Sequence, residues 1–158
     1  MLDDLRKLKP GFQSLDIFLE LARVMALPII ELVPFRVTGQ NLEVLLLKRA
    51  TDDRFWPNAL HTPGTVIRAT DTSFEDAFGR IIHDELKDLE LSKPIFVQNN
   101  LLKNARGTEV SQIYWTEVLG QPTVGEFHPI DKLPDNLLPS QTDFIKKAAE
   151  HFKEASHG

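Results

Sequence analysis

The segment of residues 56–91 constrains the fold most, because it contains a Pro-Gly turn signal followed by a strongly patterned helix. We expect this helix over residues 72–90. Thr72 can cap it, and Glu75, three residues later, can reach back to the N–H of the cap. Behind the cap, apolar residues recur at helical spacing and predict one buried stripe, formed by Phe74, Phe78, Ile82, Leu86 and Leu89, with Ile81 at its edge.

Glu85 falls inside this apolar stripe on a helical wheel of about 100° per residue. A carboxylate in a buried stripe is costly unless a partner compensates its charge. One interpretation is that Glu85 lies at the rim of the stripe or pairs with an arginine such as Arg49 or Arg68. The other interpretation is a metal site in which Asp84 and Glu85 bind Mg²⁺ or Mn²⁺, which both prefer oxygen ligands.

The same segment resembles the Nudix box, the sequence motif of the Nudix hydrolase superfamily. That motif is a Gly, five residues, a Glu, seven residues, and then Arg-Glu-(aliphatic)-x-Glu-Glu-x-Gly. The matching residues are Gly64, Ala77, Arg80, Ile82, Asp84 and Glu85, and Trp56 and Pro63 resemble the approach to such a box.

The box is degenerate at several positions. Ile81 stands where the motif has the Glu that follows Arg, and Lys87 stands where it has the closing Gly. The spacing from Gly64 to Arg80 is two residues longer than in the motif, and Asp71 is the nearest substitute for the first Glu. The Glu replaced by Ile81 normally binds metal, so two carboxylates remain where three or four are usual.

The resemblance implies a hydrolase that cleaves a nucleoside diphosphate linked to another moiety, with Mg²⁺ or Mn²⁺ assisting the attack of water on the pyrophosphate. It implies that Asp84, Glu85 and the Gly64 carbonyl bind the metal. Arg80 would orient the acidic side chains, so the candidate catalytic residues are Glu85, Asp84 and Arg80. The candidate substrate-binding residues, for the phosphate chain, are Lys48, Arg49 and Arg68.

Two other functions remain open. The chain can be a Nudix-like binding or regulatory domain that holds a nucleotide or a partner without hydrolysing it, and the loss of an acid at Ile81 favours this hypothesis. It can also be an α/β domain without a ligand. The retention of Asp84, Glu85 and Arg80 favours the hydrolase.

The remaining pattern predicts an α/β architecture of the mixed, α+β kind. The expected elements are a helix over residues 13–26, a hairpin of strands 29–37 and 42–48, strands over 65–68, 95–103 and 110–119, and a last helix capped by Ser140 and Asp143. This order predicts one central mixed β-sheet with helices on both faces. It is also the order of a Nudix-like α/β/α sandwich, so the resemblance spans residues 28–155.

Three further side chains have two interpretations each. Trp56 is expected to be a core anchor, and the alternative is a platform for a ligand. His61 is expected to face solvent from a loop, and the alternative is contact with substrate. Glu117 is expected to face water from its strand, and the alternative is that it supplements the helix acids.

Composition restricts the partners. A chain of 158 residues suits one domain, with an N-terminal helical extension (residues 1–27) and a Nudix-like domain (residues 28–158). The net charge of −5 argues against a nucleic-acid backbone as partner. The partner that the resemblance implies is a small nucleotide-type ligand. No run reaches the roughly 18 apolar residues of a membrane span, and the acidic start lacks the features of a secretion signal. We therefore expect no membrane partner and a cytoplasmic location, and the added helix suggests a homodimer.

Overall fold

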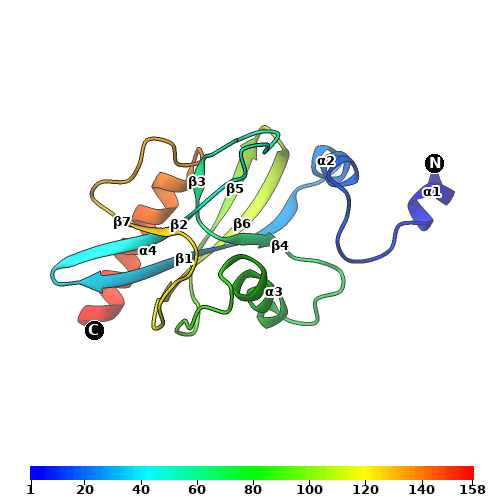
Figure 1. Ribbon diagram of the computed structural model, residues 1–158. Helices are drawn as coiled ribbons and strands as arrows, with labels where there is room; N and C mark the ends of the chain where they lie inside the picture. Colours follow the sequence, from blue (N-terminus) through cyan, green and yellow to red (C-terminus); the bar gives the residue numbers. More distant parts are fainter.

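The computed structural model describes residues 1–158 and is built around a seven-stranded mixed sheet (Figure 1). The strands are β1 (Leu27–Thr38), β2 (Asn41–Lys48), β3 (Leu60–His61), β4 (Gly64–Val66), β5 (Ile95–Asn104), β6 (Gly107–Glu117) and β7 (Glu126–Pro129). The helices are α1 (Leu2–Arg6), α2 (Leu15–Val24), α3 (Phe74–Arg80), the π-helical η1 (Ile81–Glu85) and α4 (Gln141–His157). The strand order is β3-β2-β1-β6-β5, with β4 paired to β1 and β7 paired to β2.

Strand β1 organises the sheet, because its partner on one edge changes along its length. On the other edge it runs parallel to β6 over its first nine residues. On the changing edge, β1 pairs with β4 up to Glu31, which lies opposite Gly64. From Phe35 onward it pairs instead with β2, in the predicted hairpin. The sheet therefore has a junction next to Glu31 and Gly64.

The two faces of the sheet carry separate hydrophobic cores. On one face, Ile30 and Leu32 pack with residues of α3, η1 and the turn that follows. On the opposite face, Val33 and Phe35 pack with the buried side of α4. A strand buried on both faces reads as a nearly continuous apolar run, which explains the composition of residues 29–37.

Helices α2 and α4 lie toward opposite ends of the sheet (Figure 1). Ala22 and the half-buried Phe18 of α2 pack with Leu27 and Ile29 at the start of β1, whereas α4 packs where β1 continues as Val33 and Phe35. Along β1, Glu31 lies between these two clusters. Because side chains alternate along a strand, Glu31 is on the same face of the sheet as Ile29 and Val33. This arrangement leaves a stretch of the sheet between the two helices.

The fold-class prediction is confirmed: the structure is a mixed α/β protein with a central mixed sheet and helices on both sides. The hairpin, the two long strands β5 and β6, and the helices α2 and α4 lie close to the expected ranges. Strands β3 and β7 fall in segments that we expected to be loops. Both are short and pair with β2, and such a distant partner leaves no periodic signal in a segment of two or four residues.

The helix expected over residues 72–90 is shorter and changes type. It is α-helical only to Arg80, and after the π-helical η1 the chain turns at Lys87 and Asp88, which both have positive φ. The wider π-helical turn alters which side chains face the core, so Ile81 is fully buried and Phe74 is exposed. The predicted stripe is therefore wrong at these two positions.

The predicted caps are also wrong in detail. Ser73, rather than Thr72, is the N-cap of α3, and the side chain of Thr72 bonds to Asp76 instead of Glu75. Ser140 precedes α4 in a left-handed conformation and makes no capping hydrogen bond with its side chain. Both helices are held mainly by their packing against the sheet.

Helix α1 projects away from the rest of the molecule (Figure 1), and all of its residues are exposed. None of the helices has the length and apolar character needed to cross a bilayer. The division into residues 1–27 and 28–158, the homodimer and the cytoplasmic location stay predictions.

Candidate functional site

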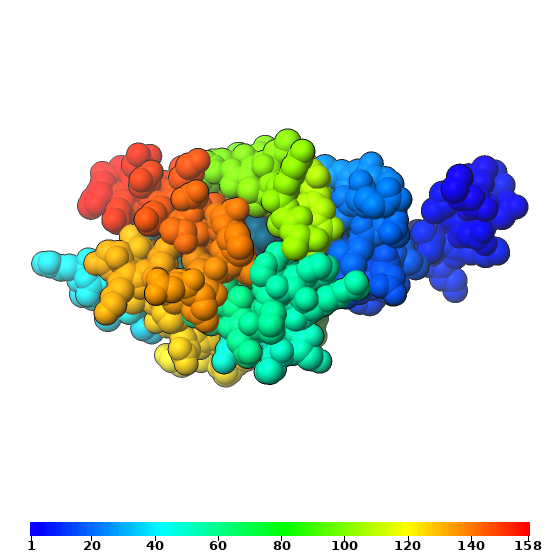
Figure 2. All heavy atoms as spheres, turned by 90° about the horizontal axis from the view of Figure 1, so that it is seen from above, coloured from blue at the N-terminus to red at the C-terminus, as the bar shows by residue number.

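A cavity of about 970 Å³ opens on the sheet between α2 and the start of α4. Figure 2 shows this face hollowed, with blue strand residues visible between the teal loop after β2, the yellow-green β5–β6 region and the orange segment before α4. Its walls come from five parts of the chain: residues 10–31, 48–69, Glu85, 102–109 and 138–144. The cavity therefore gathers side chains that are far apart in the sequence, as ligand sites commonly do.

At the sheet junction, Glu31 and Gly64 are in close contact. A side chain at Gly64 would place its Cβ 2.8 Å from the Glu31 Oε2 atom and 2.8 Å from the Ile30 carbonyl oxygen, so only glycine fits there. The Thr62 hydroxyl donates a hydrogen bond to Glu31 Oε2 at 3.0 Å. Burial raises the pKa of Glu31 to about 8, and the nearby carboxylates of Glu109 and Glu85 add to the rise.

Glu85, at the end of η1, also contacts Gly64. Its Oε1 atom accepts a hydrogen bond from the Gly64 N–H at 3.3 Å. Burial raises the pKa of Glu85 to about 7, although this hydrogen bond and the positive charge of Arg49 oppose the rise. Two carboxyl groups with raised pKa values thus meet around Gly64, and Glu31 was not found from the sequence.

Asp84 lies outside this arrangement. Its side chain is exposed and does not line the cavity. Of the two adjacent acids, only Glu85 reaches Gly64. The expectation that the two acids share one space is not met by this geometry.

The side chains present do not fit the metal site that the resemblance implies. The structure contains no group of three or more His, Cys, Asp or Glu residues that could hold a metal ion. Ile81, at the position of the missing Glu, is 1% exposed and packs in the core beneath α3. Among the motif positions, only Glu85 and the backbone of Gly64 lie together at the cavity.

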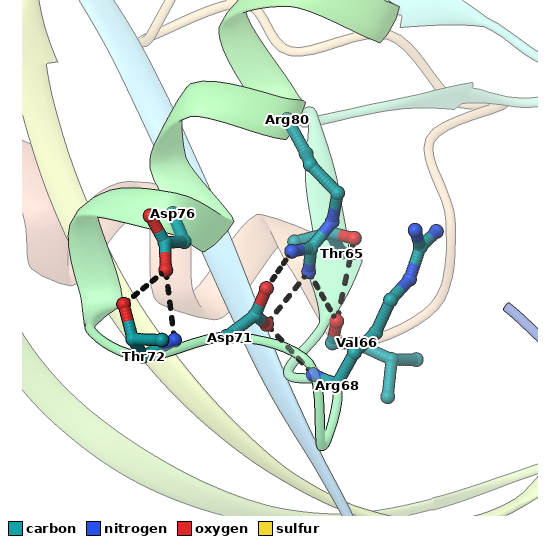
Figure 3. Close-up of polar contacts among 7 residues, drawn as sticks. All are labelled: Thr65, Val66, Arg68, Asp71, Thr72, Asp76 and Arg80. Carbon is teal, nitrogen blue, oxygen red and sulfur yellow. Dashed lines mark hydrogen bonds and ion pairs between the residues drawn. The ribbon is translucent and has the colours of Figure 1, made fainter. Parts of the chain in front are cut away.

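Arg80 forms a clamp on the loop before α3 (Figure 3). Its guanidinium pairs with both oxygens of Asp71 and donates to the Val66 carbonyl at 2.9 Å. Asp71 also accepts the Arg68 N–H at 2.7 Å, and the charge of Arg80 lowers the pKa of Asp71. Asp71 thus closes the lengthened loop onto the helix. The prediction that Arg80 orients Asp84 and Glu85 is wrong in this structure, because Arg80 contacts neither.

Another part of the cavity wall is basic and aromatic. The guanidinium carbons of Arg49 and Arg106 lie 5.6 Å and 5.2 Å from the centre of the Trp56 ring. Arg49 pairs with Asp53 at 3.1 Å, and Arg106 pairs with the buried Glu109 at 2.7 Å. Trp56 therefore lines the cavity as a partner of two arginines.

His61 lines the cavity as well, contrary to the expectation that it faces solvent. Its Nδ1 atom lies 2.7 Å from the Thr62 carbonyl oxygen, to which it donates as a neutral ring. Burial and the positive charge of Arg49 lower the pKa of His61 to about 4. His61 is therefore neutral at neutral pH.

The three predicted substrate-binding residues, Lys48, Arg49 and Arg68, all line the cavity. The Arg68 guanidinium also lies 5.6 Å from the ring centre of Phe12, which comes from the N-terminal segment. Sequence reasoning missed Glu31 and Arg106. A lone acid in the apolar run of residues 29–37 was a usable signal for Glu31, whereas a turn arginine such as Arg106 gives none.

Comparison with known proteins identifies the fold. No protein-family model matches the chain, and no curated protein matches it. Among solved structures, the NUDIX domain of Shewanella oneidensis NrtR, complexed with ADP ribose, is similar with a TM-score of 0.65 and 19% identity over 96% of this chain and 97% of that domain. A mutT/nudix family protein from Listeria innocua gives a TM-score of 0.65 with 17% identity, covering 82% and 96% of the two chains.

The Ap4A hydrolase of C. elegans is similar with a TM-score of 0.62 and 12% identity, over 81% of this chain and 99% of that one. These similarities show that the chain has the Nudix fold, as the resemblance predicted.

Proposed function

We propose that this Nudix-fold chain binds a nucleoside diphosphate derivative in the cavity between α2 and α4, and that it acts as a binding or regulatory domain. One observation carries the proposal. Of the three acidic positions in the second half of the box, only Glu85 contributes a carboxyl group to the cavity, while Ile81 is core and Asp84 faces solvent. The cavity retains groups for recognition, and the box contributes only one carboxylate to it.

The chemistry of the cavity supports a ligand that carries both phosphate groups and sugar hydroxyls. A guanidinium group can donate two parallel hydrogen bonds to the oxygens of a phosphate. Arg49 and Arg106 lie together at one part of the cavity wall. Carboxyl groups accept hydrogen bonds from sugar hydroxyls, and a protonated carboxyl can also donate one. Glu31 and Glu85, with pKa values raised to about 8 and about 7, offer both possibilities near neutral pH. A cavity of about 970 Å³ is large enough for a dinucleotide-sized ligand.

Isothermal titration calorimetry with ADP-ribose, in a buffer that contains EDTA, tests the proposal. ADP-ribose is the probe because a structural neighbour was solved with it. We expect saturable binding without metal, and weaker binding of AMP and of ribose 5-phosphate, each of which carries only part of the ligand. Absence of binding for ADP-ribose and for a panel of other nucleoside diphosphate derivatives would overturn the proposal.

The second candidate function is the hydrolase that the sequence resemblance implies. One observation favours it: Glu85 and Gly64, which both match the box, are in hydrogen-bond contact at the cavity. This function would require Asp84 and Arg80 to act with Glu85 as the catalytic residues, and Asp84 to join Glu85 and Gly64 around Mg²⁺ or Mn²⁺, an arrangement that this structure does not have. Turnover of any nucleoside diphosphate derivative that needs either metal, and that is lost in Glu85→Gln, would replace the first proposal by this one.

A further inference from the structure

The Arg49–Trp56–Arg106 cluster joins three separate segments of the chain at one wall of the cavity. Arg49 follows β2, Trp56 lies in the loop before β3, and Arg106 lies in the turn between β5 and β6. Both guanidinium groups lie against the same indole ring, at 5.6 Å and 5.2 Å. The two groups therefore flank one indole ring at the wall of the cavity.

Each arginine of the cluster is fixed in place but has few protein acceptors. An arginine side chain carries five N–H donors. Arg49 makes one hydrogen bond, to Asp53, and Arg106 makes one, to Glu109. The Nε atom of each is buried without any partner. Most N–H donors of these two arginines therefore have no acceptor in the protein. Because both side chains line the cavity, such donors are suited to binding an anion.

The surroundings hold the cluster rigid. Asp53 accepts the backbone N–H groups of Phe55 and Trp56 at 3.0 Å and 2.8 Å, so it fixes the indole as well as Arg49. Gly107, next to Arg106, packs against α2 so closely that an added Cβ would lie 2.6 Å from the Ala22 carbonyl oxygen. The N-terminal helix α2 thus positions the turn that carries Arg106.

The local field agrees with an anion site. Burial is the largest cause that lowers the pKa of His61, the positive charges of Arg49 and Arg106 add to it, and the charge of Asp53 opposes it. Part of the lowering therefore comes from the positive charge that the two arginines place at this wall.

We propose that Arg49 and Arg106, held against Trp56, form the subsite for the diphosphate of the ligand. This inference rests on the proposed function and extends it, because it assigns the phosphate-binding end of the cavity and gives α2 a role in positioning Arg106.

The test compares matched arginine variants by calorimetry, with inorganic pyrophosphate and ADP-ribose as probes. Arg49→Gln and Arg106→Gln each remove a charge-assisted contact and should weaken the binding of both probes at least tenfold. Arg36→Gln is the control, since Arg36 also pairs with a glutamate and stacks on a phenylalanine, yet lies outside the cavity. The affinity of Arg36→Gln for both probes should stay within twofold of the wild-type value.

A double variant keeps the test valid if Arg106→Gln alone fails to fold. Arg106→Gln leaves the buried Glu109 without its partner, so Arg106→Gln/Glu109→Gln keeps a neutral pair in the same space. Folding of every variant is checked by thermal unfolding. The double variant should fold and still bind both probes at least tenfold more weakly.

Two outcomes separate this inference from the proposed function. If the wild type binds ADP-ribose and folded Arg49 and Arg106 variants bind it equally well, the subsite assignment is wrong while the proposed function stands. If the wild type binds neither pyrophosphate nor ADP-ribose nor any other nucleoside diphosphate derivative of the panel, both are wrong.

Discussion

The two ends of the segment from Gly64 to Glu85 have opposite characters. At the clamp, Arg80, Asp71 and the Val66 carbonyl form a closed network in which the carboxylate is fully paired and its pKa is lowered. At the acidic end, Gly64 brings together Glu31 and Glu85, whose pKa values are raised because both carboxyl groups are buried. Paired groups stabilise the fold, and perturbed groups at a cavity are typical of binding sites. The residues that match one motif thus divide into a structural set and a ligand-facing set.

Ile81 lies between the two ends, and changing it should have the largest effect. Ile81→Glu places a charge in a core position that is 1% exposed, so we expect the free energy of unfolding to fall by about 4 kcal/mol. Ile82→Glu, at the neighbouring half-buried position, is the control and should cost much less. Urea unfolding measures both. An Ile81→Glu variant as stable as the wild type, with tighter Mn²⁺ binding, would show that this position faces a metal site.

The acidic end should make stability depend on pH. Because the pKa of Glu31 is raised from 4.5 to about 8, the folded state holds a proton that the unfolded chain releases. The stability from this group is fully present below pH 4.5 and is lost as the pH rises through 8. Glu31→Gln removes the ionisation.

We therefore expect Glu31→Gln to be more stable than the wild type by about 3 kcal/mol at pH 9 and nearly equal to it at pH 5, after allowance for the residual solvent contact of the side chain. Chemical denaturation at a series of pH values measures this difference. A difference that does not change with pH would contradict the raised pKa.

The clamp should contribute stability without contributing to ligand binding. Asp71→Asn removes the charge that pairs with the largely buried Arg80, and we expect a loss of about 2 kcal/mol. Asp76→Asn, in the first turn of α3, is the control, because Asp76 is exposed and bonds only to Thr72 in Figure 3. Its loss should be smaller. Asp71→Asn that folds normally but no longer binds ADP-ribose would place the clamp in the site.

The smallest effects should distinguish two neighbouring acids. Glu85→Gln alters a group at the cavity, and we expect ADP-ribose affinity to change by about fivefold, which corresponds to about 1 kcal/mol. Asp84→Asn alters an exposed side chain and should leave both affinity and stability within experimental error. Calorimetry on the two variants measures the contrast. Equal effects would mean that both acids reach the ligand.

Local patterns in the sequence were sufficient for the main elements of the fold. Alternating apolar residues predicted the hairpin and β6, and helical spacing predicted α2 and α4. The change from α3 to η1 could not be predicted, because it depends on how Ile81 and Leu86 pack against β1 and β2. The short strands β3 and β7 depend on pairing with β2 and leave no signal of their own.

The candidate site divides in the same way. Glu85, Gly64, Lys48, Arg49 and Arg68 were identified from the motif and its neighbourhood, and all line the cavity. Arg106 and Glu109 enter it only because α2 packs on the β5–β6 turn, a contact between segments more than 80 residues apart. No spacing rule relates such residues. The buried carboxylate of Glu31 had a detectable signal, since it interrupts an apolar strand.

Phosphorus NMR of ADP-ribose mixed with the protein tests the central claim most directly, because one sample reports both binding and hydrolysis. In EDTA, the account predicts that the two diphosphate resonances shift or broaden in proportion to protein concentration. After Mg²⁺ is added in excess, it predicts the same two resonances and no new phosphate monoester signals over many hours. Monoester signals that grow with time in Mg²⁺ and are absent with Glu85→Gln would contradict the account and identify the chain as a hydrolase.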